Sequence, residues 1–207
     1  ERLTIVNHIA KTASAALNPD DLMETVYQEI VPTFQLDGFF IALYDQEANE
    51  LEFRFHVDEG ARIPPERRPL GGFSSLVVAQ KKPLIIRDLE REPEYQPMVM
   101  SIGTGKHPAS WLGAPLLVGE QVLGVINVQS YRPHVWDEED ELLLFTIVDQ
   151  IAVALENVRL FEEARDRAER LAVVNRITNA TSAVLDLDDL METVYRELVP
   201  TFQPDAF

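Results

Sequence analysis

Cysteine is absent from this chain of 207 residues, and its absence excludes several kinds of chemistry. Without thiols there are no disulfide bonds, thiolate metal sites, cysteine nucleophiles or thioether-linked cofactors. Long apolar runs are also missing, because no stretch approaches the ~18 to 20 residues that span a bilayer. The first residues, ERLTIVNHIA, lack the basic region and cleavage site of a signal peptide. We therefore expect a cytoplasmic location and no membrane insertion within this segment.

Basic residues are scarce. The chain has 18 Lys and Arg against 35 Asp and Glu, which makes its formal net charge −17. A nucleic-acid-binding face needs clustered positive charge to displace counterions from phosphates, so we expect no nucleic-acid partner. Hydrophobic residues make up 46% of the chain and charged residues 26%, a balance typical of globular proteins with a substantial core.

Glycine and proline are both missing between Pro133 and Pro200, which favours a long helix. Asp137 is a good N-cap, and continuous helix from there to Leu185 would span about 70 Å at 1.5 Å per residue. The stretch carries apolar residues at a three-four spacing, which predicts a seam that packs against another helix. These residues are Ile147, Ile151, Ala154, Val158 and Phe161.

The chain repeats itself over a long interval. Residues 1–39 match residues 169–207 at 25 of 39 positions, where unrelated sequences would match at about two. The offset of 168 residues is too long for a solenoid unit and fits a whole domain with its connector. We predict a complete domain over residues 1–165. Residues 166–207 would then be a connector helix and the N-terminal helices of a second, truncated copy.

The best-matching part of the repeat predicts a helix. DLMETVYQEIVPTFQ, from residue 21, returns as DLMETVYRELVPTFQ from residue 189. Asn18 is a suitable N-cap, and Leu22, Val26 and Ile30 recur every four residues to form an apolar face. Because a proline disfavours helical backbone in the residue before it, we expect this helix to end near Val31 and Pro32.

Extended patterns fill the middle of the chain. Residues 37–57 read as two strands around a polar turn, the second alternating apolar side chains from Leu51 to Val57. Residues 63–72 are predicted to be a loop, and Ser74 would cap a short helix. Three more strands are expected at residues 83–89, 111–118 and 121–130, the last two joined by the hairpin dipeptide Gly119-Glu120.

Three successive blocks resemble the GAF domain: PLIIRDLEREPEY, then SWLGAPLLVGEQVLGVINVQS, then WDEEDELLLFTIVDQIAVALENVRLFEEA. The resemblance covers residues 3–164. It implies an α+β, GAF-like (PAS-related) fold with a six-stranded antiparallel sheet. The N- and C-terminal helices would pack on one face, while loops and short helices enclose a small-molecule pocket on the other. GAF domains act as sensory or dimerising modules in bacterial signalling proteins and often occur in tandem.

Departures from known GAF subfamilies restrict the function. The chain lacks the cysteine that attaches bilin in phytochrome GAF domains and the catalytic cysteines of GAF-fold methionine sulfoxide reductases. It also lacks the NKFDE pattern of cyclic-nucleotide-binding members and any clustered ligand set for iron. We expect a non-enzymatic sensory module with an unknown small-molecule ligand and no covalent bilin. A ligand-free structural dimerisation module is the alternative.

Candidate ligand-binding residues lie where the resemblance implies a pocket. Without a fixed strand register, alternation leaves open which side chains point inward, and core packing remains the alternative for each aromatic residue. The stretch from Glu90 to Ser110 is long for a connection, which favours a lid. The candidates are Tyr44, Phe53, Phe55, Tyr95, Met98, Met100, Trp111 and Asn127.

Charge suggests one possible ligand property. Residues 54–106 have a net charge of +2, because they hold 9 basic and 7 acidic residues, so an anionic ligand is one hypothesis and solvated loops are the other. The basic residues expected on the pocket side are Arg67, Arg68, Lys81, Lys82, Arg87 and Arg91.

The connector indicates how a signal would travel. The helix that ends one domain copy runs into the first helix of the next without a flexible linker, and a rigid helix transmits rotation or register change. We expect a parallel homodimer through helices at residues 3–17 and 142–161. The apolar face of the truncated copy would pack on helices of another chain, as in domain swapping.

Overall fold

One antiparallel sheet organises the first of two compact units. The structure is a computed structural model that describes residues 18–100, 105–183 and 187–202, and it divides into residues 1–158 and 159–207. The strands are β1 (Gly38–Asp45), β2 (Glu50–Asp58), β3 (Ala61–Arg62), β4 (Glu66–Pro69), β5 (Leu84–Ile86), β6 (Ser110–Val118) and β7 (Gln121–Ser130). Their order is β3-β2-β1-β7-β6-β5, and β4 also pairs with β2. The helix expected over residues 3–17 lies outside the described residues.

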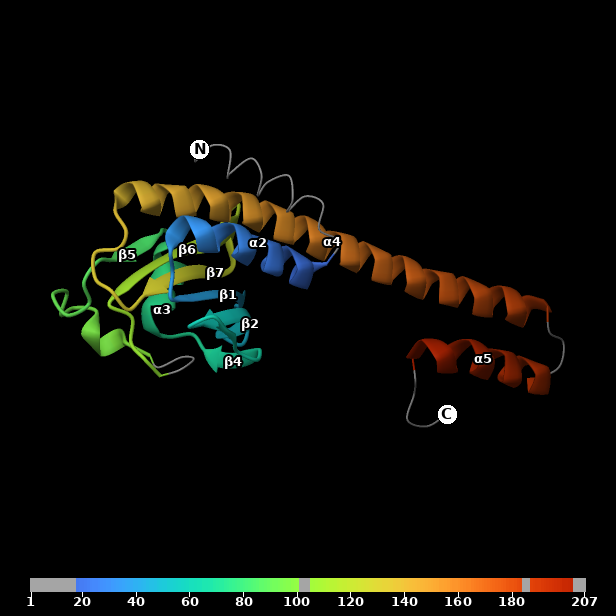
Figure 1. Cartoon of the computed structure of the whole chain (residues 1–207). Helices are drawn as coiled ribbons and strands as arrows, with labels where there is room; N and C mark the ends of the chain where they lie inside the picture. The colour runs from blue at the N-terminus through green and yellow to red at the C-terminus, as the bar shows by residue number, and fades with distance from the viewer. Residues whose placement is uncertain (1–17, 101–104, 184–186, 203–207) are drawn as a thin grey trace. The chain divides into compact units, whose positions relative to one another are not determined.

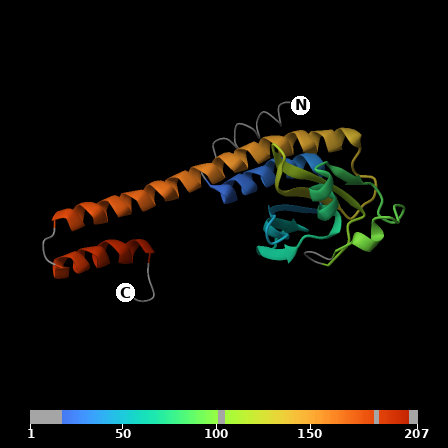
Figure 2. The ribbon, with the colours of Figure 1, turned by 180° about the vertical axis from the view of Figure 1, so that it is seen from behind.

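Helices cover the two faces of this sheet differently (Figures 1 and 2). On one side, called here the helix face, lie α2 (Pro19–Phe34) and the part of α4 (Glu138–Ala183) that precedes Arg159. On the other side, the pocket face, lie α3 (Gly72–Gln80) and the segment with the 3-10 turn η1 (Gln96–Met98). The predicted α+β architecture is therefore confirmed.

Strand β4 was not expected. The prolines and glycines of residues 63–72 predicted a loop, but four residues of this stretch pair with β2, from Glu50 opposite Pro69 to Phe53 opposite Glu66. Pro69 is tolerated because it is the last residue of a strand at the sheet edge, where its missing N–H leaves no central ladder position empty.

The helix-face core is formed by the apolar residues whose spacing predicted the helices and strands. Each large apolar side chain that is fully buried in this core contributes about 1.5–3 kcal/mol relative to an exposed one. The core includes Leu22, Met23, Val26, Ile30 and Phe34 of α2, Phe39 and Ile41 of β1, and Ile147, Ile151 and Ala154 of α4. The last three belong to the seam predicted for α4, which therefore packs within the domain core.

Helix α2 continues past its proline. Asn18 caps the first turn as expected, its Oδ1 accepting a hydrogen bond from the backbone N–H of Asp21 at 2.8 Å. The helix ends at Phe34, three residues beyond Val31, near which its end was expected. The buried Phe34 ring anchors this last turn, and the Trp136 indole N–H donates a hydrogen bond to the Phe34 carbonyl at 3.0 Å. Tertiary contacts thus outweigh the local cost of proline.

A bulge in β2 reverses the direction of its side chains. Ile41 pairs with Phe55 and Ala42 pairs with Phe53, so Arg54 is an extra residue on the β2 side. Phe53 consequently belongs to the pocket-face core, whereas Phe55 belongs to the helix-face core. A regular alternation would have placed both rings on one face.

Helix α4 begins as the sequence predicts. The Asp137 carboxylate accepts hydrogen bonds from the backbone N–H groups of Glu139 and Asp140, at 2.9 and 3.1 Å. The predicted helix from Asp137 to Leu185 is confirmed over Glu138–Ala183. Within the described ranges, no helix is both long and apolar enough to cross a membrane.

The second unit contains the end of α4 and α5 (Leu187–Phe202), which lie side by side (Figures 1 and 2). Arg176 Nε of α4 forms an ion pair with Glu197 Oε2 of α5 at 2.9 Å. Several apolar side chains of this unit are exposed to solvent. They are Leu160, Phe161, Leu171, Val174, Met191 and Tyr195.

Candidate ligand-binding pocket

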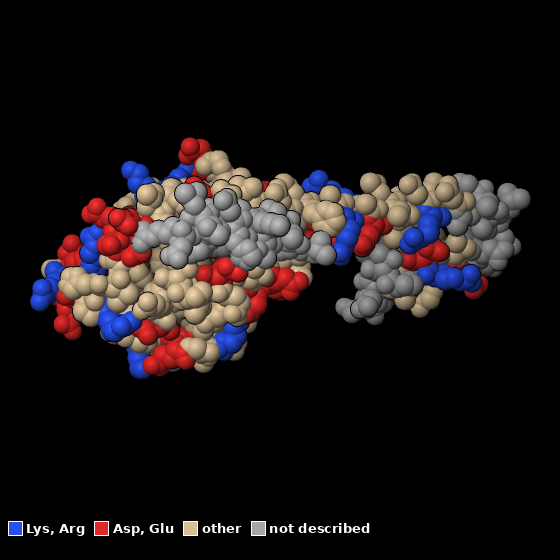
Figure 3. All heavy atoms as spheres, turned by 45° about the horizontal axis from the view of Figure 1, so that its top comes forward, with Lys and Arg blue, Asp and Glu red and all other residues tan. Residues whose placement is uncertain are grey.

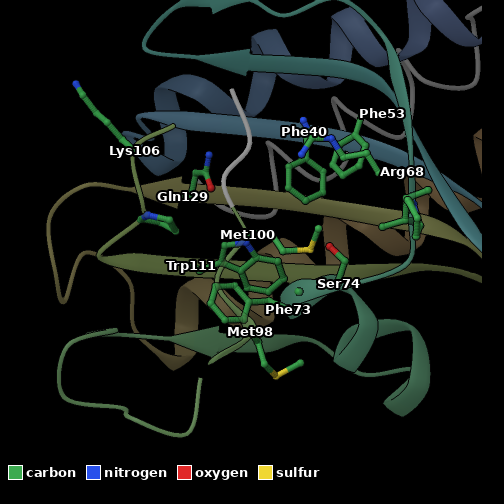
Figure 4. A pocket seen from close by; sticks show the side chains of 15 residues that line it. Phe40, Phe53, Arg68, Phe73, Ser74, Met98, Met100, Lys106, Trp111 and Gln129 are labelled. Atoms are coloured by element: carbon green, nitrogen blue, oxygen red, sulfur yellow. The ribbon is translucent and has the colours of Figure 1, made fainter. Parts of the chain in front are cut away.

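A small cavity lies on the pocket face, between the sheet and the start of α3. Its volume is about 40 Å³. The first wall comes from β1 and β2, the second from α3 and the turn before it, and the third from the segment around Met100 (Figure 4). The lining residues are Phe40, Leu51, Phe53, Arg68, Pro69, Gly71, Gly72, Phe73, Ser74, Met98, Met100, Lys106, Pro108, Trp111 and Gln129.

Four of the lining residues are aromatic. Phe40 and Phe53 meet edge to face on neighbouring strands, with ring centroids 5.0 Å apart. Phe73 of α3 meets Trp111 of β6 in the same way at 5.4 Å. Edge-to-face pairs stabilise one another by about 0.5–1.5 kcal/mol beyond their burial, so these rings are held as rigid walls.

The start of α3 forms the opposite side of the cavity. Ser74, expected as the helix cap, is instead its third residue, and Gly71 occupies the cap position without a side-chain hydrogen bond. Gly72 has a φ of +59°, and a Cβ there would lie 3.1 Å from the Met100 sulfur. Backbone conformation and contact with Met100 both favour glycine at residue 72.

Two polar side chains line the cavity without a partner. Ser74 is 6% exposed and Gln129 is 8% exposed, yet neither side chain makes a hydrogen bond within the part of the chain that the structure describes. Gln129 lies flat over Gly38, where a Cβ would collide with its carboxamide. Figure 4 shows the Ser74 hydroxyl turned toward the cavity.

Two cationic side chains also line the cavity, and they lie differently. Arg68 forms a two-point ion pair with Glu66, in which Nε–Oε1 and Nη2–Oε2 are both 3.0 Å apart. Lys106 extends away from the cavity in Figure 4 and pairs with Glu59. Arg68 is therefore the cation that the geometry brings to the pocket.

A buried histidine lies behind the aromatic wall. His56 of β2 and Asn127 of β7 flank Phe40 on either side, and both are fully buried. Both His56 ring nitrogens and the Asn127 Oδ1 lack hydrogen-bond partners in the described structure. Burial lowers the pKa of His56 below its usual value and outweighs nearby Asp58, which acts in the opposite direction.

A model of the GAF domain family matches residues 16–156, the stretch that contains the sheet, both helix layers and the cavity. The chain belongs to the GAF domain family. The resemblance on which the fold was predicted is thereby confirmed, and the cavity lies on the face of the GAF sheet where a pocket was expected.

Relatives of this GAF domain include regulators. The formate hydrogenlyase transcriptional activator of Salmonella typhimurium is 25% identical over 209 residues, covering 96% of this chain and 30% of the activator. Our chain therefore spans about a third of that relative's length. GAF domains serve as sensory and regulatory modules, as in this activator.

Solved structures share the fold at low sequence identity. The GAF domain of the Acinetobacter phosphoenolpyruvate-protein phosphotransferase is 16% identical with a TM-score of 0.64, covering 78% of this chain and 97% of that chain. The free methionine-R-sulfoxide reductase of Neisseria meningitidis is 16% identical with a TM-score of 0.61, covering 77% and 90%. The GAF fold therefore serves an enzyme as well as regulators.

The structure brings four of the eight candidate residues of this GAF domain to the cavity: Phe53, Met98, Met100 and Trp111. Tyr95 packs against the outer side of Phe73, with ring centroids 6.2 Å apart. Tyr44 bonds Asn49 at the strand end, and the Asn127 amide nitrogen donates to the carbonyls of Leu112 and Val128.

Phe55 does not face the pocket. It packs against Phe39 and Tyr27 under α2, because the bulge at Arg54 sends it to the helix face. The sequence pattern did not single out Phe40, Phe73, Ser74 or Gln129 as ligand-binding residues. Phe40 and Gln129 lie in segments recognised as strands, but their direction depends on a register that only the folded sheet defines.

The basic residues expected near the pocket are mostly neutralised by acidic partners. Arg67 lies 2.7 Å from Glu52, and Lys81 lies 3.1 Å from Glu120. Arg87 and Arg91 pair with Glu138 and Asp88. Of the six, Arg68 alone lines the cavity. Among the described residues, no group of His, Asp or Glu side chains could hold a metal ion.

Proposed function

We propose that this chain is a non-enzymatic, regulatory GAF module that binds a small molecule in the cavity and relays the binding event through α4. The observation that carries the proposal is the pair Ser74 and Gln129, which are buried at the cavity without hydrogen-bond partners in the described structure. A ligand with matching polar groups would supply the hydrogen bonds that these two side chains lack.

Sheet geometry supports a relay from the pocket to α4. Phe40 lines the cavity and pairs with Asn127 on the neighbouring strand, while their chain neighbours Phe39 and Ile126 belong to the core that contains α4. Because protein interiors are close-packed, a ligand that shifts these strands also shifts what α4 packs against. The cavity and α4 are separated by one sheet layer.

The repeat supports a destination for the signal. Helix α5 matches α2 at 13 of 16 positions, so residues 166–207 are proposed to begin a second GAF copy after the complete domain at 1–165. A movement of α4 would then reach the first helix of that copy. The whole would be a tandem GAF region of a bacterial signalling protein that acts in the cytoplasm.

Side-chain chemistry supports the non-enzymatic part of the proposal. The sequence contains no cysteine, and the residues described at the cavity include no histidine or carboxylate to act as a general base. Ser74 therefore has no partner that would activate it as a nucleophile there.

The proposal is tested by screening the purified chain for thermal stabilisation with a panel of neutral, anionic and zwitterionic metabolites. Compounds that bind are then examined by amide hydrogen exchange along α4. We expect at least one compound to stabilise the wild type and the Ser75→Ala control, but not Ser74→Leu, whose larger side chain fills the cavity. Protection should change in α4.

Two outcomes would contradict this function. One is that no compound binds and Ser74→Leu is more stable than the wild type, which identifies a self-filled structural core. The other is that a compound binds without altering exchange in α4, which removes the relay.

A homodimer is a second candidate function, favoured by one observation in the second unit. Leu160, Leu171 and Val174 are exposed on α4, and their spacings of 11 and 3 residues place them on one side of the helix. Exposed apolar rows of this kind pack against a second helix, and a second copy of the chain offers an identical row.

Light scattering of the full chain tests the dimer. We expect a dimer for the wild type, a monomer for Leu160→Glu combined with Leu171→Glu, and a dimer for the control Asp166→Lys on another side of α4. A monomeric wild type would overturn the dimer and leave the ligand-binding function standing.

A further inference from the structure

We propose that the cavity selects a small monocarboxylate whose carboxylate binds at the start of α3, between Ser74 and Arg68, with its short carbon chain inside the aromatic wall. This inference rests on the proposed ligand-binding function and names the class of ligand. It is carried by the geometry of the helix start, the buried polar groups, the charge and the size of the cavity.

The start of α3 offers backbone donors at the cavity. Gly72, Phe73 and Ser74 line it, and as the first three residues of α3 they precede the first i→i−4 hydrogen bond of the helix. The first N–H groups of a helix carry partial positive charge and bind anions when no side chain caps them. Gly71, at the cap position, supplies no such side chain.

Two side chains that line the same cavity give independent support for a ligand. As whole residues Ser74 is 6% exposed and Gln129 is 8% exposed, and neither side chain has a hydrogen-bond partner in the described structure. Both groups can donate a hydrogen bond to a carboxylate oxygen. The backbone N–H groups and both side chains can therefore all donate hydrogen bonds to carboxylate oxygens.

Charge limits the ligand to a single negative charge. Arg68 is the cationic side chain that lies at the cavity, and its guanidinium is already balanced in part by Glu66 at 3.0 Å. The Lys106 ammonium turns away toward Glu59 (Figure 4). On the face of the first unit that Figure 3 shows, acidic side chains stand among the basic ones. A phosphate dianion would lack the positive charge that its burial requires.

The volume limits the ligand to a few atoms. A cavity of about 40 Å³ has room for about three water molecules, taking about 10–15 Å³ for each. A carboxylate with one or two further carbons fills this space and places those carbons against Phe40 and Trp111. Met100 closes the cavity over Gly72, and its flexible thioether can adapt to a methyl or ethyl group.

Binding of acetate and propionate to the full chain tests the proposal, measured by titration calorimetry at constant ionic strength. Acetamide serves as the neutral isostere, inorganic phosphate as the multiply charged anion and benzoate as the large carboxylate. We expect acetate or propionate to bind at least about tenfold more tightly than each of these three, because a charge-assisted hydrogen bond is stronger than one between neutral groups.

Matched variants locate the site. Arg68→Gln and Ser74→Ala should each weaken propionate binding about tenfold or more. Their neighbours provide controls, because Arg67 pairs with Glu52 away from the cavity and Ser75 bonds the Gly72 carbonyl at 2.7 Å. Arg67→Gln and Ser75→Ala should bind as the wild type does. Circular dichroism of all four variants verifies that they fold.

Equal binding of acetamide and acetate, or unchanged affinity in both Arg68→Gln and Ser74→Ala, would overturn the proposal. Preference for phosphate would also overturn it and assign a different anion. If a neutral metabolite binds the cavity instead, the ligand class is wrong while the sensory function stands. If propionate binds as expected without changing exchange in α4, the ligand class holds and the relay fails.

Discussion

Helices α2 and α5 have nearly the same sequence and very different surroundings. Met23 of α2 is 2% exposed, whereas its counterpart Met191 of α5 is 55% exposed. In the first unit the apolar face of α2 packs on the sheet, and in the second unit α5 lies beside the end of α4. The apolar pattern of a helix therefore specifies which face can be buried, and burial occurs only where another surface of the protein matches that face.

The largest difference in stability should appear when an aspartate is placed on the apolar face of each helix in turn. Val26→Asp places a carboxylate in the helix-face core, and we expect it to lower the free energy of unfolding by about 3–5 kcal/mol or to prevent folding. Val194→Asp, at the equivalent position of α5, should cost less than about 1 kcal/mol because Val194 is only half-buried. Urea denaturation measures both, and equal losses would refute the contrast.

Truncating the paired methionines should give a smaller difference. Met23→Ala leaves a cavity in a close-packed core, so we expect a loss of about 2–5 kcal/mol. Met191→Ala removes an exposed side chain and should change stability by about 0.5 kcal/mol or less. A large loss for Met191→Ala in thermal or urea unfolding would mean that the α5 face is covered in solution, for example by a second chain.

Acid should weaken the first unit more than the second, because His56, whose pKa is lowered by burial, lies in the first unit. The folded pKa of His56 lies below the unfolded value, so the unfolded chain binds more protons as the pH falls through about 6.5. Stability is thus present above that pH and lost below it. Wild-type unfolding should therefore take up as much as about one proton at His56 between pH 7 and pH 5. In His56→Leu this uptake is absent, so we expect the free energy of unfolding to fall less steeply over the same range.

Amide hydrogen exchange reports on the two units separately. Protection of β2 should fall as the pH of the wild type is lowered, whereas protection of α5 should be the same in the wild type and in His56→Leu. An unaltered pH dependence in His56→Leu would show that the buried imidazole is not the group responsible.

The smallest effect should come from the ion pair of the second unit. Arg176→Ala removes the 2.9 Å contact with Glu197, and exposed pairs contribute about 0.2–1 kcal/mol. We expect faster amide exchange in α5 and no change in α2. Salt should diminish the effect, and an equal change in α2 would argue against two separate units.

Local patterns were sufficient for much of the fold. The four-residue apolar spacing of α2, the cap at Asp137 and the Gly119-Glu120 hairpin are each formed by residues close in sequence, and each is confirmed. Helix α2 extends three residues beyond Val31 because Phe34 and Trp136, 102 residues apart, hold its last turn. Ser74 was predicted to cap α3, but the helix begins two residues earlier, at Gly72, and the neighbouring sequence did not indicate this start.

The candidate site was harder to predict from sequence. Trp111 and Phe53 were recognised as aromatic residues on strands, but which strand residues face the pocket depends on register and on the bulge at Arg54. One inserted residue sends Phe55 to the opposite face. Gln129 carried no distinguishing pattern, because its exposure to the cavity depends on the bare backbone of Gly38 beneath it.

By itself the sequence determined the repeat, the faces of the helices and the family, because these follow from residue order and short-range periodicity. Tertiary structure alone decided which copy of the repeated helix is buried and which side chains meet at the cavity. The physical reason is that burial and convergence require surfaces from distant parts of the chain. Phe40, Ser74 and Gln129 share one cavity only after the strands have paired and α3 has packed against them.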